Sequence, residues 1–240
     1  MSAVVFSAAD GVATLTLNRP ESRNALNLEM CEGIIEAART AVSDDSIKLF
    51  FVKAKGSVFC AGADLKERQG MSGAQVRERR MKGFAAYSAL EALPMPSVAV
   101  LQGPAIGSGC EIAGACDFIV ATPEASFRTP EATRGTVGAT QRLPRILGKR
   151  LAKDLMFTGR ELSAVEASEA GLVSRLVLPA DLESELKKIV ETVLKAPQQS
   201  LRLAKRCIDR GVELDPKGAL ETEIAAIEEQ LAAGTWMGKR

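Results

Sequence analysis

The chain contains no histidine among its 240 residues. This absence excludes the Ser-His and Cys-His pairs that activate a nucleophile, and every metal site that uses an imidazole ligand. Any chemistry must therefore use carboxylates, backbone amides, or lysine, tyrosine and cysteine side chains. The cysteines are Cys31, Cys60, Cys110, Cys116 and Cys207. Because they are odd in number and none is spaced as C-x-x-C, we expect free thiols and no metal site.

Three further absences limit the partners of the chain. No run of about 18 apolar residues occurs, so the sequence predicts no transmembrane helix. The formal net charge is only +1, which gives no basic field for nucleic acid or an acidic membrane. The first residues carry Asp10 and no basic leader, which argues against a signal peptide. We therefore expect a cytoplasmic protein with neither a nucleic-acid partner nor a membrane partner.

Strands and short helices alternate through the first half of the sequence. The runs 4–7 and 12–18 flank Asp10-Gly11, a dipeptide typical of a hairpin turn. Further strands are predicted at 47–54, 97–102 and 117–122, and helices after Asn27, from Asp64, and from the break at 70–73 to about Leu93. This repetition indicates a right-handed α/β coil rather than an open doubly wound sheet. From about Leu151 onward the sequence predicts almost only helix, including 182–195, 200–210 and 221–233.

Two stretches with small residues share one design. "FCAGADLKE" (59–67) and "AIGSGCEIA" (105–113) each follow a predicted buried strand and open a predicted helix. A strand-to-helix turn directs the first free N–H groups of the helix outward, at the positive end of its dipole. Two such N–H groups from separate loops could stabilise a negatively charged oxygen. The alternative is that the glycines only permit tight turns.

Two glutamates stand out beside these loops. Glu111 falls on the first turn of a predicted helix, within a run of isoleucine, alanine and cysteine. Glu131 follows Pro130 in a loop that also holds Phe127. Either side chain could be solvated. If Phe127 instead walls Glu131 from water, burial would raise its pKa and suit it to proton transfer.

An ordered set of motifs covers nearly all of residues 4–235. They are "NRPESRNALN", "FCAGADLKE", "PAIGSGCEIAGACDFIVA", "FRTPE", "TQRLPRILGK" and "TGRELSAVEASEAGLV". In this order they resemble the enoyl-CoA hydratase/isomerase (crotonase) family. The resemblance implies an α/β, crotonase-like (ClpP/crotonase) fold of repeated ββα units in a right-handed coil, with a helical C-terminal part. It divides the chain into a core at 1–190 and a helical trimerisation region at 191–240.

The resemblance also implies the site residues. Backbone N–H groups of Ala63 and Ser108 match the oxyanion hole of the family, where serine replaces the more common glycine at the second position. Glu111 and Glu131 match its catalytic glutamates. The residues that match its coenzyme A contacts are Arg23, Ala25, Leu26, Ala61, Asp64, Leu65 and Lys66. Arg23 and Lys66 are the candidates for the phosphates.

By the same resemblance, the substrate is an acyl-CoA thioester, and no separate cofactor is required because coenzyme A is part of the substrate. A homotrimer or a dimer of trimers is implied. The expected activity is that of an enoyl-CoA hydratase. The stretch "ATRGTVGA" after Glu131 is shorter than in the hydratases of the family, which leaves two alternatives open. One is an enoyl-CoA isomerase with one dominant glutamate, and the other is a non-catalytic acyl-CoA-binding homologue.

The length of the acyl chain also stays open. Four side chains are candidates for the wall of the acyl pocket, namely Met71, Met81, Phe84 and Tyr87. Each could equally belong to the core.

Overall fold

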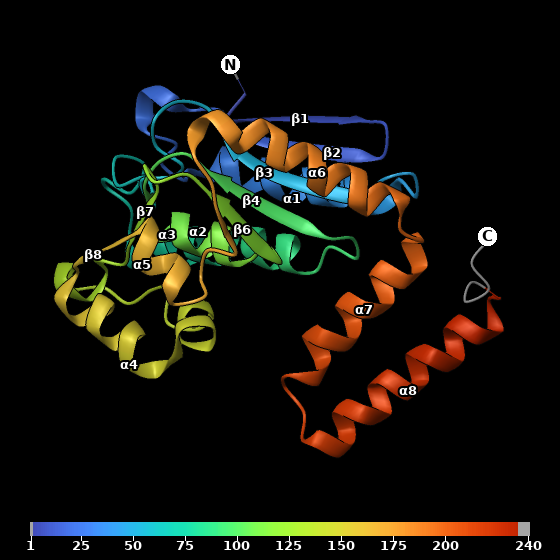
Figure 1. The fold of residues 1–240 in the computed structure, drawn as a ribbon. Helices are drawn as coiled ribbons and strands as arrows, with labels where there is room; N and C mark the ends of the chain where they lie inside the picture. Colours follow the sequence, from blue (N-terminus) through green and yellow to red (C-terminus); the bar gives the residue numbers. More distant parts are fainter. Residues whose placement is uncertain (1, 235–240) are drawn as a thin grey trace.

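The computed structural model describes residues 2–234. The chain begins with an antiparallel hairpin of β1 (Val4–Ala9) and β2 (Val12–Leu17), as the sequence predicts (Figure 1). Asp10 and Gly11 both adopt positive φ angles, of 50° and 80°. An aspartate followed by glycine tolerates this backbone, which matches the twist of the two strands.

The hairpin opens a six-stranded sheet in the order β1-β2-β3-β4-β6-β9. Every pair after the hairpin is parallel. The further strands are β3 (Leu49–Ala54), β4 (Ser97–Leu101), β6 (Phe118–Ala121) and β9 (Arg175–Leu176). Their nearly continuous apolar sequences are typical of parallel strands that are covered on both faces.

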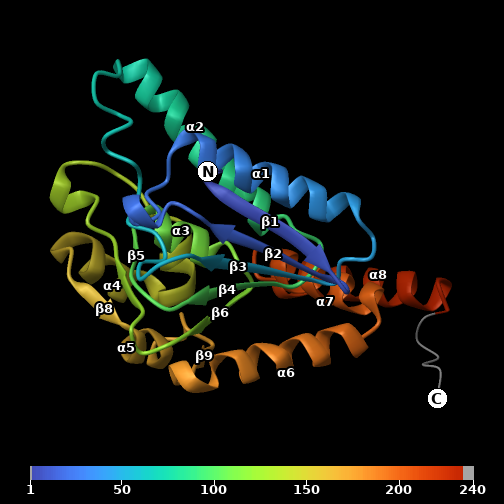
Figure 2. The same ribbon diagram turned by 90° about the horizontal axis from the view of Figure 1, so that it is seen from above.

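Alternate residues of these strands face two different layers of helices. Phe50 and Val52 pack in the main core, with residues of α1 (Leu28–Ser43), α2 (Gly73–Glu91) and α3 (Ser108–Gly114). Leu49 and Phe51 pack instead against α6 (Leu182–Lys195). Figure 2 shows α1 and α6 on opposite sides of the sheet. The period of two along a strand produces these two layers.

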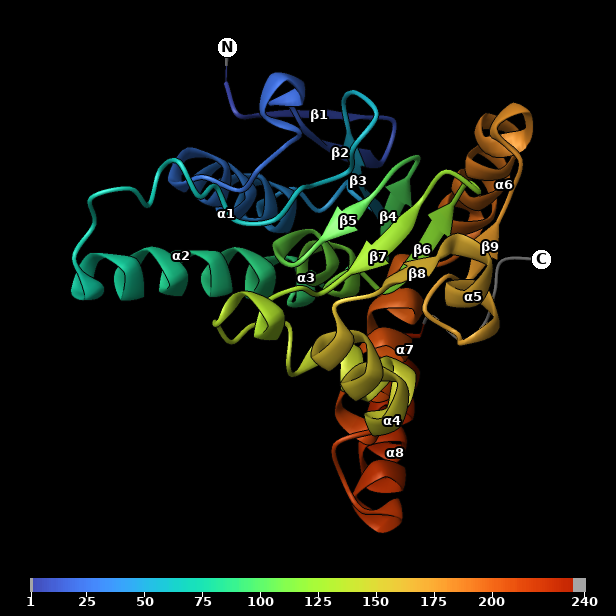
Figure 3. The ribbon, with the colours of Figure 1, turned by 90° about the vertical axis from the view of Figure 1, so that its left-hand side faces the viewer.

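A second, smaller sheet carries the strand ends that matter for function. It contains β5 (Ala105–Ile106), β7 (Ser126–Arg128) and β8 (Glu161–Ser163), in the order β5-β7-β8 (Figure 3). Two isolated parallel bridges extend it, between Cys60 and Ala105 and between Leu26 and Ala63. The stretch 60–63 therefore lies between Leu26 and β5, so the two small-residue loops are neighbours.

The helix predicted from Asp64 is wrong. Residues 65–70 form turns, in which the N–H of Gln69 donates to the carbonyl of Lys66 over 3.2 Å. The Asp64 carboxylate accepts the N–H groups of Lys66 and Glu67, as a helix cap would, but Gly70 at φ 79° ends the segment. A new helix, α2, starts from a capping box between Ser72 and Gln75.

From about Leu151 onward the chain is mostly helical, as predicted, and two very short strands, β8 and β9, interrupt it. These strands complete the two sheets, but two or three residues are too few to show an alternating pattern. The helices are α4 (Arg142–Thr158), α5 (Ala164–Glu169), α6, α7 (Gln198–Gly211) and α8 (Pro216–Ala232). Short 3-10 helices occur at Pro20–Ser22, Ala132–Arg134 and Pro179–Asp181.

Helices α7 and α8 lie beside each other and extend away from both sheets (Figure 1). The boundary predicted at residue 190 falls within α6, and residues 235–240 of the predicted trimerisation region lie outside the described residues. The division into a core and an assembly region stays a prediction. Within residues 2–234, no helix combines the length and the apolar character needed to cross a bilayer.

Candidate active site

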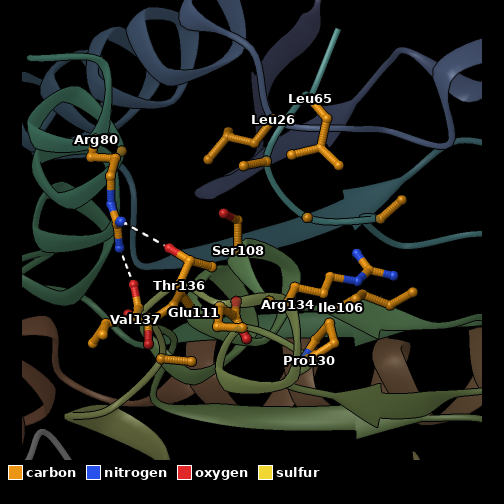
Figure 4. A pocket seen from close by; sticks show the side chains of 18 of the residues that line it. Leu26, Leu65, Arg80, Ile106, Ser108, Glu111, Pro130, Arg134, Thr136 and Val137 are labelled. Carbon is orange, nitrogen blue, oxygen red and sulfur yellow. Dashed lines mark hydrogen bonds between the residues drawn. The ribbon is translucent and has the colours of Figure 1, made fainter. Parts of the chain in front are cut away.

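A cavity of about 360 Å³ lies where the two small-residue loops meet α2 and the loop that follows β7. Figure 4 shows Ser108 and Glu111 near its centre. Arg80 lies to one side of them with Thr136 and Val137, and Leu65, Ile106 and Arg134 lie toward the other side. The cavity therefore has a centre, at Ser108 and Glu111, and two ends, one near Arg80 and the other near Leu65.

The first small-residue loop directs the N–H of Ala63 toward this centre. In the bridge with Leu26, the N–H of Leu26 donates to the carbonyl of Gly62 over 2.8 Å, and the N–H of Asp64 donates to the carbonyl of Leu26 over 2.9 Å. Ala63 lies between Gly62 and Asp64 in sequence. Because groups along a strand point alternately to its two sides, the N–H of Ala63 points away from Leu26, toward β5. Gly62 permits the close approach, because a Cβ there would lie 3.1 Å from the carbonyl oxygen of Ile106.

The second loop presents the N–H of Ser108. Ser108 is the first residue of α3, so its amide has no acceptor one turn earlier in the helix. A Cβ at Gly109 would collide with the carbonyl oxygen of Cys60, so glycine lets α3 approach the first loop. Within residues 2–234, neither Ala63 nor Ser108 donates its N–H to an acceptor, and both line the cavity. Two free amides at one cavity can stabilise a developing oxyanion.

Glu111 projects from α3 into the same cavity and is held by an ion pair. Its side chain is only 7% exposed, and its Oε2 lies 2.7 Å from Nη1 of Arg142 at the start of α4. Arg142 also pairs with Glu91 at 2.6 Å and lies over the ring of Tyr87. Burial raises the pKa of Glu111, and the Arg142 guanidinium opposes that rise.

Glu131 reaches the cavity from the loop after β7 and has no ion pair within the described residues. Its Oε2 is buried and has no hydrogen-bond partner there. Burial raises the pKa of Glu131, and the nearby charge of Glu111 adds to this rise. Its own backbone N–H and the charges of Arg134 and Arg80 oppose the rise without cancelling it. Two glycines make room for the side chain. A Cβ at Gly107 would collide with Oε1, and a Cβ at Gly138 would lie 3.0 Å from Cγ.

The seven residues predicted to contact coenzyme A divide into two groups. Leu26, Ala61 and Leu65 line the cavity, whereas Arg23, Ala25, Asp64 and Lys66 do not. Arg23 and Lys66 are exposed cations, and neither forms an ion pair with another described residue.

Asp64 is buried and already has partners. It pairs with Arg19 over 2.9 Å and accepts the N–H groups of Lys66 and Glu67. Burial raises the pKa of Asp64, but the hydrogen bonds from Arg19 and the backbone outweigh this effect and hold the pKa below its usual value. The carboxylate therefore stabilises the turn at 65–70.

Two of the four side chains considered for the wall of the acyl pocket line the cavity, and two do not. Phe84 and Tyr87 line the cavity, whereas Met71 and Met81 do not. Phe127, the residue that could have walled Glu131, lies in the main core and does not line the cavity.

Sequence reasoning missed several residues that line the cavity or contact its acids. Arg142 belongs to the motif "TQRLPRILGK", and nothing local in that motif indicates a contact with Glu111, 31 residues earlier. Arg68 and Arg80 line the cavity but lie in a stretch with many charges, so their sequence context does not distinguish them.

Within residues 2–234, no cluster of three or more acidic, cysteine or histidine side chains is arranged to hold a metal ion.

Comparisons with known proteins agree with this architecture. A sequence profile of the enoyl-CoA hydratase/isomerase family matches residues 7–234. A crotonyl-CoA hydratase of Syntrophomonas wolfei is 36% identical over 228 residues, which cover 93% of this chain and 87% of that protein. The mouse mitochondrial enoyl-CoA hydratase domain-containing protein 2 is 40% identical over 224 residues, which cover 89% of this chain and 75% of that protein.

A solved structure of an enoyl-CoA hydratase from Bacillus anthracis superposes with a TM-score of 0.90 at 35% identity. The match covers 94% of this chain and 90% of that one. The crotonase-like fold predicted from the ordered motifs is therefore confirmed.

Proposed function

Since the chain belongs to the enoyl-CoA hydratase/isomerase family, we propose that it is an enoyl-CoA hydratase, which adds water across the double bond of a 2-enoyl-CoA thioester. One observation carries the proposal. Two carboxylates, Glu111 and Glu131, face the same cavity as two free backbone amides, and within residues 2–234 only Glu111 has a cation in contact. This asymmetry suits a reaction that needs a base and an acid at once.

The amides of Ala63 and Ser108 would bind the thioester oxygen. When water attacks the β-carbon, electrons move onto this oxygen and form an enolate. Preorganised donors bind that charge more strongly than the neutral carbonyl, and each is worth about 3–4 kcal/mol in comparable sites. Serine in place of glycine at position 108 does not remove the donor, because the group that acts is the backbone N–H.

The two glutamates would divide the proton transfers. Glu111 stays ionised beside Arg142 and accepts a proton from the attacking water. Glu131, buried with no cation in contact among the described residues, starts protonated and donates to the α-carbon as the enolate collapses. The proton taken by Glu111 then returns to Glu131 through solvent, which restores both groups.

The coenzyme A arm would run from the cavity past Ala61 and Leu65 to the protein surface. Arg23 and Lys66, exposed and without ion pairs to described residues, are proposed to bind its phosphates. No metal or separate cofactor is needed in this reaction, because the amides stabilise the oxyanion and the carboxylates move the protons.

We also propose that the functional unit is a homotrimer or a dimer of trimers, assembled through α7 and α8. Apolar side chains on these helices are solvent-exposed in the single chain, including Ile208 at 65%, Leu220 at 57% and Ile227 at 48%. A large exposed apolar surface of this kind is typical of an interface.

The test is to incubate the protein with crotonyl-CoA in ¹⁸O-labelled water. A hydratase produces 3-hydroxybutyryl-CoA with one labelled oxygen at the β-carbon. Faster conversion of a 3-enoyl-CoA to its 2-enoyl isomer, without label, would favour the isomerase instead. Binding of crotonyl-CoA without any turnover would favour the non-catalytic homologue.

A further inference from the structure

Three arginines that are close in sequence line the cavity, and two of them form no ion pair with another described residue. Arg79 and Arg80 on α2, and Arg68 in the turn before it, all line the cavity. Arg79 is fully engaged, because it pairs with Glu67 and donates to the carbonyl of Leu26. Within residues 2–234, Arg68 and Arg80 form no ion pair.

Arg80 is held in place by uncharged acceptors. Its Nη1 donates to Oγ1 of Thr136 over 3.2 Å, and its Nη2 donates to the carbonyl oxygen of Val137. Figure 4 shows the side chain crossing from α2 to this loop at one end of the cavity. The two bonds fix the guanidinium, which forms no ion pair with another described residue.

Arg68 is less well satisfied. Its Nε is buried and has no hydrogen-bond partner among the described residues. Burial lowers the pKa of Arg68, and the charges of Arg79 and Arg80 lower it further. A buried donor that lacks a partner costs free energy that a ligand acceptor would recover.

The end of the cavity near Arg80 is the one that the acyl chain would reach. Leu65, a proposed coenzyme A contact, lies across Ser108 and Glu111 from Arg80 (Figure 4). A thioester whose oxygen lies at Ser108 would therefore extend its acyl chain toward Arg80. The acidic groups at the centre, Glu111 and Glu131, belong to the proposed proton transfers, and neither forms an ion pair with Arg68 or Arg80, although the Arg80 charge lowers the pKa of Glu131.

We infer that the preferred substrate is an enoyl-CoA whose acyl chain ends in a carboxylate, bound by Arg68 and Arg80. The inference rests on the proposed function for the position of the thioester. A guanidinium matches a carboxylate in charge and in bidentate geometry. A purely hydrocarbon chain would instead meet two cations and leave the Arg68 Nε without a partner.

Binding and turnover can be measured with matched probes. The saturated probes are glutaryl-CoA and its uncharged isostere, in which a terminal isopropyl group replaces the carboxylate. Calorimetric titration should give about 10- to 100-fold tighter binding of glutaryl-CoA, the range expected for hydrogen bonds to a charged group. The unsaturated pair, glutaconyl-CoA and its isopropyl isostere, should differ similarly in kcat/KM.

Arg68→Met is the primary variant, because Arg68 makes no hydrogen bond through Nε to the described residues, whereas Arg80 also holds a loop. It should remove most of the preference for the carboxylate while changing kcat/KM for crotonyl-CoA by less than about threefold. Arg68→Lys, which keeps the charge, should retain part of the preference. Arg77→Met removes an exposed charge from the same helix as Arg80, outside the cavity, and should retain all of it.

The readouts separate this inference from the proposed function. If no enoyl-CoA is hydrated but glutaryl-CoA still binds more tightly than its isostere in an Arg68-dependent way, the hydratase proposal fails and the carboxylate site stands. If crotonyl-CoA is hydrated but wild-type protein does not prefer the carboxylates, the inference is overturned. It is also overturned if Arg68→Met weakens the binding of both members of a pair equally.

Discussion

Arg142 lies 2.7 Å from Glu111, measured from Nη1 to Oε2, and this ion pair joins the start of α4 to the first turn of α3. Glu131 faces the same cavity without such a partner among the described residues. One tertiary contact therefore distinguishes two acids that sequence motifs treat as a pair. The proposed base and acid follow from this difference in environment.

Replacement of Arg142 by methionine should shift the pH dependence of activity. Without the guanidinium, burial and the charge of Glu91 act on Glu111 unopposed, and its pKa rises further. A base must be deprotonated to act, so the acidic limb of the kcat/KM profile should move to higher pH. Arg142→Lys should shift it less. Arg145→Met removes an exposed arginine of the same helix and should leave the limb unchanged. An unshifted limb in Arg142→Met would contradict the assignment of Glu111 as the base.

Glu111→Gln and Glu131→Gln should each lower turnover of crotonyl-CoA by about 10²- to 10⁴-fold, the usual contribution of a general acid or base. Glutamine keeps the shape of the side chain and removes its titrating proton, so folding and coenzyme A binding should persist. The double variant should lose less than the product of the two single losses. Glu78→Gln, at an exposed position on α2, should match wild type. Wild-type turnover in both single variants would end the hydratase proposal.

Gly107→Ala should abolish most activity, because Gly107 has φ 52° and a Cβ there would collide with Oε1 of Glu131. Gly135→Ala is a matched control, since Gly135 also has positive φ, at 71°, but a Cβ there meets nothing within 4 Å. Backbone strain differs between the two sites. Gly135, at ψ 25°, lies in the left-handed helical region, where a Cβ should cost about 1–2 kcal/mol of unfolding free energy. Gly107, at ψ −107°, lies in a region that almost only glycine adopts, where the cost should be about 1–3 kcal/mol. Activity should fall at least about tenfold more in Gly107→Ala, given the contribution of a general acid. Equal losses in steady-state turnover would show that strain, not contact with Glu131, matters.

The ion pair between Asp64 and Arg19 should stabilise the fold in a pH-dependent way. The pKa of Asp64 is held below its ordinary value of 3.8, so its contribution is full above the unfolded pKa and is lost as pH falls through the folded pKa. Urea denaturation should therefore find Asp64→Asn less stable than wild type at pH 7, with a difference that shrinks below about pH 4. Arg19→Met should reproduce most of the loss at neutral pH. A difference that is independent of pH would argue against an ionised Asp64.

Sedimentation should give a mass near three or six times the 25.5 kDa chain at micromolar concentration. Replacing Ile208 and Ile227 together by aspartate should reduce it toward a single chain, because buried unpaired carboxylates disrupt an apolar interface. Val5→Asp, at an exposed apolar position on β1, should retain the larger mass. A single-chain mass for the unmodified protein would exclude the proposed assembly.

Some of the fold was predictable because it depends on neighbouring residues. Asp10-Gly11 specifies a hairpin turn, and Asn27 accepts the N–H of Met30 over 3.0 Å as the cap of α1. The helix expected from Asp64 failed for the opposite reason. Its cap is present, but Gly70 and the capping box at Ser72 end the segment before a helical turn repeats.

The sequence by itself determined the alternation of strands and helices, the absence of imidazole chemistry, and the two small-residue loops that expose Ala63 and Ser108. These properties depend on composition and on short-range geometry, which a linear pattern records. Only the tertiary structure decided that Arg142 contacts Glu111, that Glu131 fits against Gly107 and Gly138, and that Arg68 and Arg80 line the same cavity. Such contacts join residues from different strands and helices, and the charge and space around a carboxylate depend on those distant neighbours.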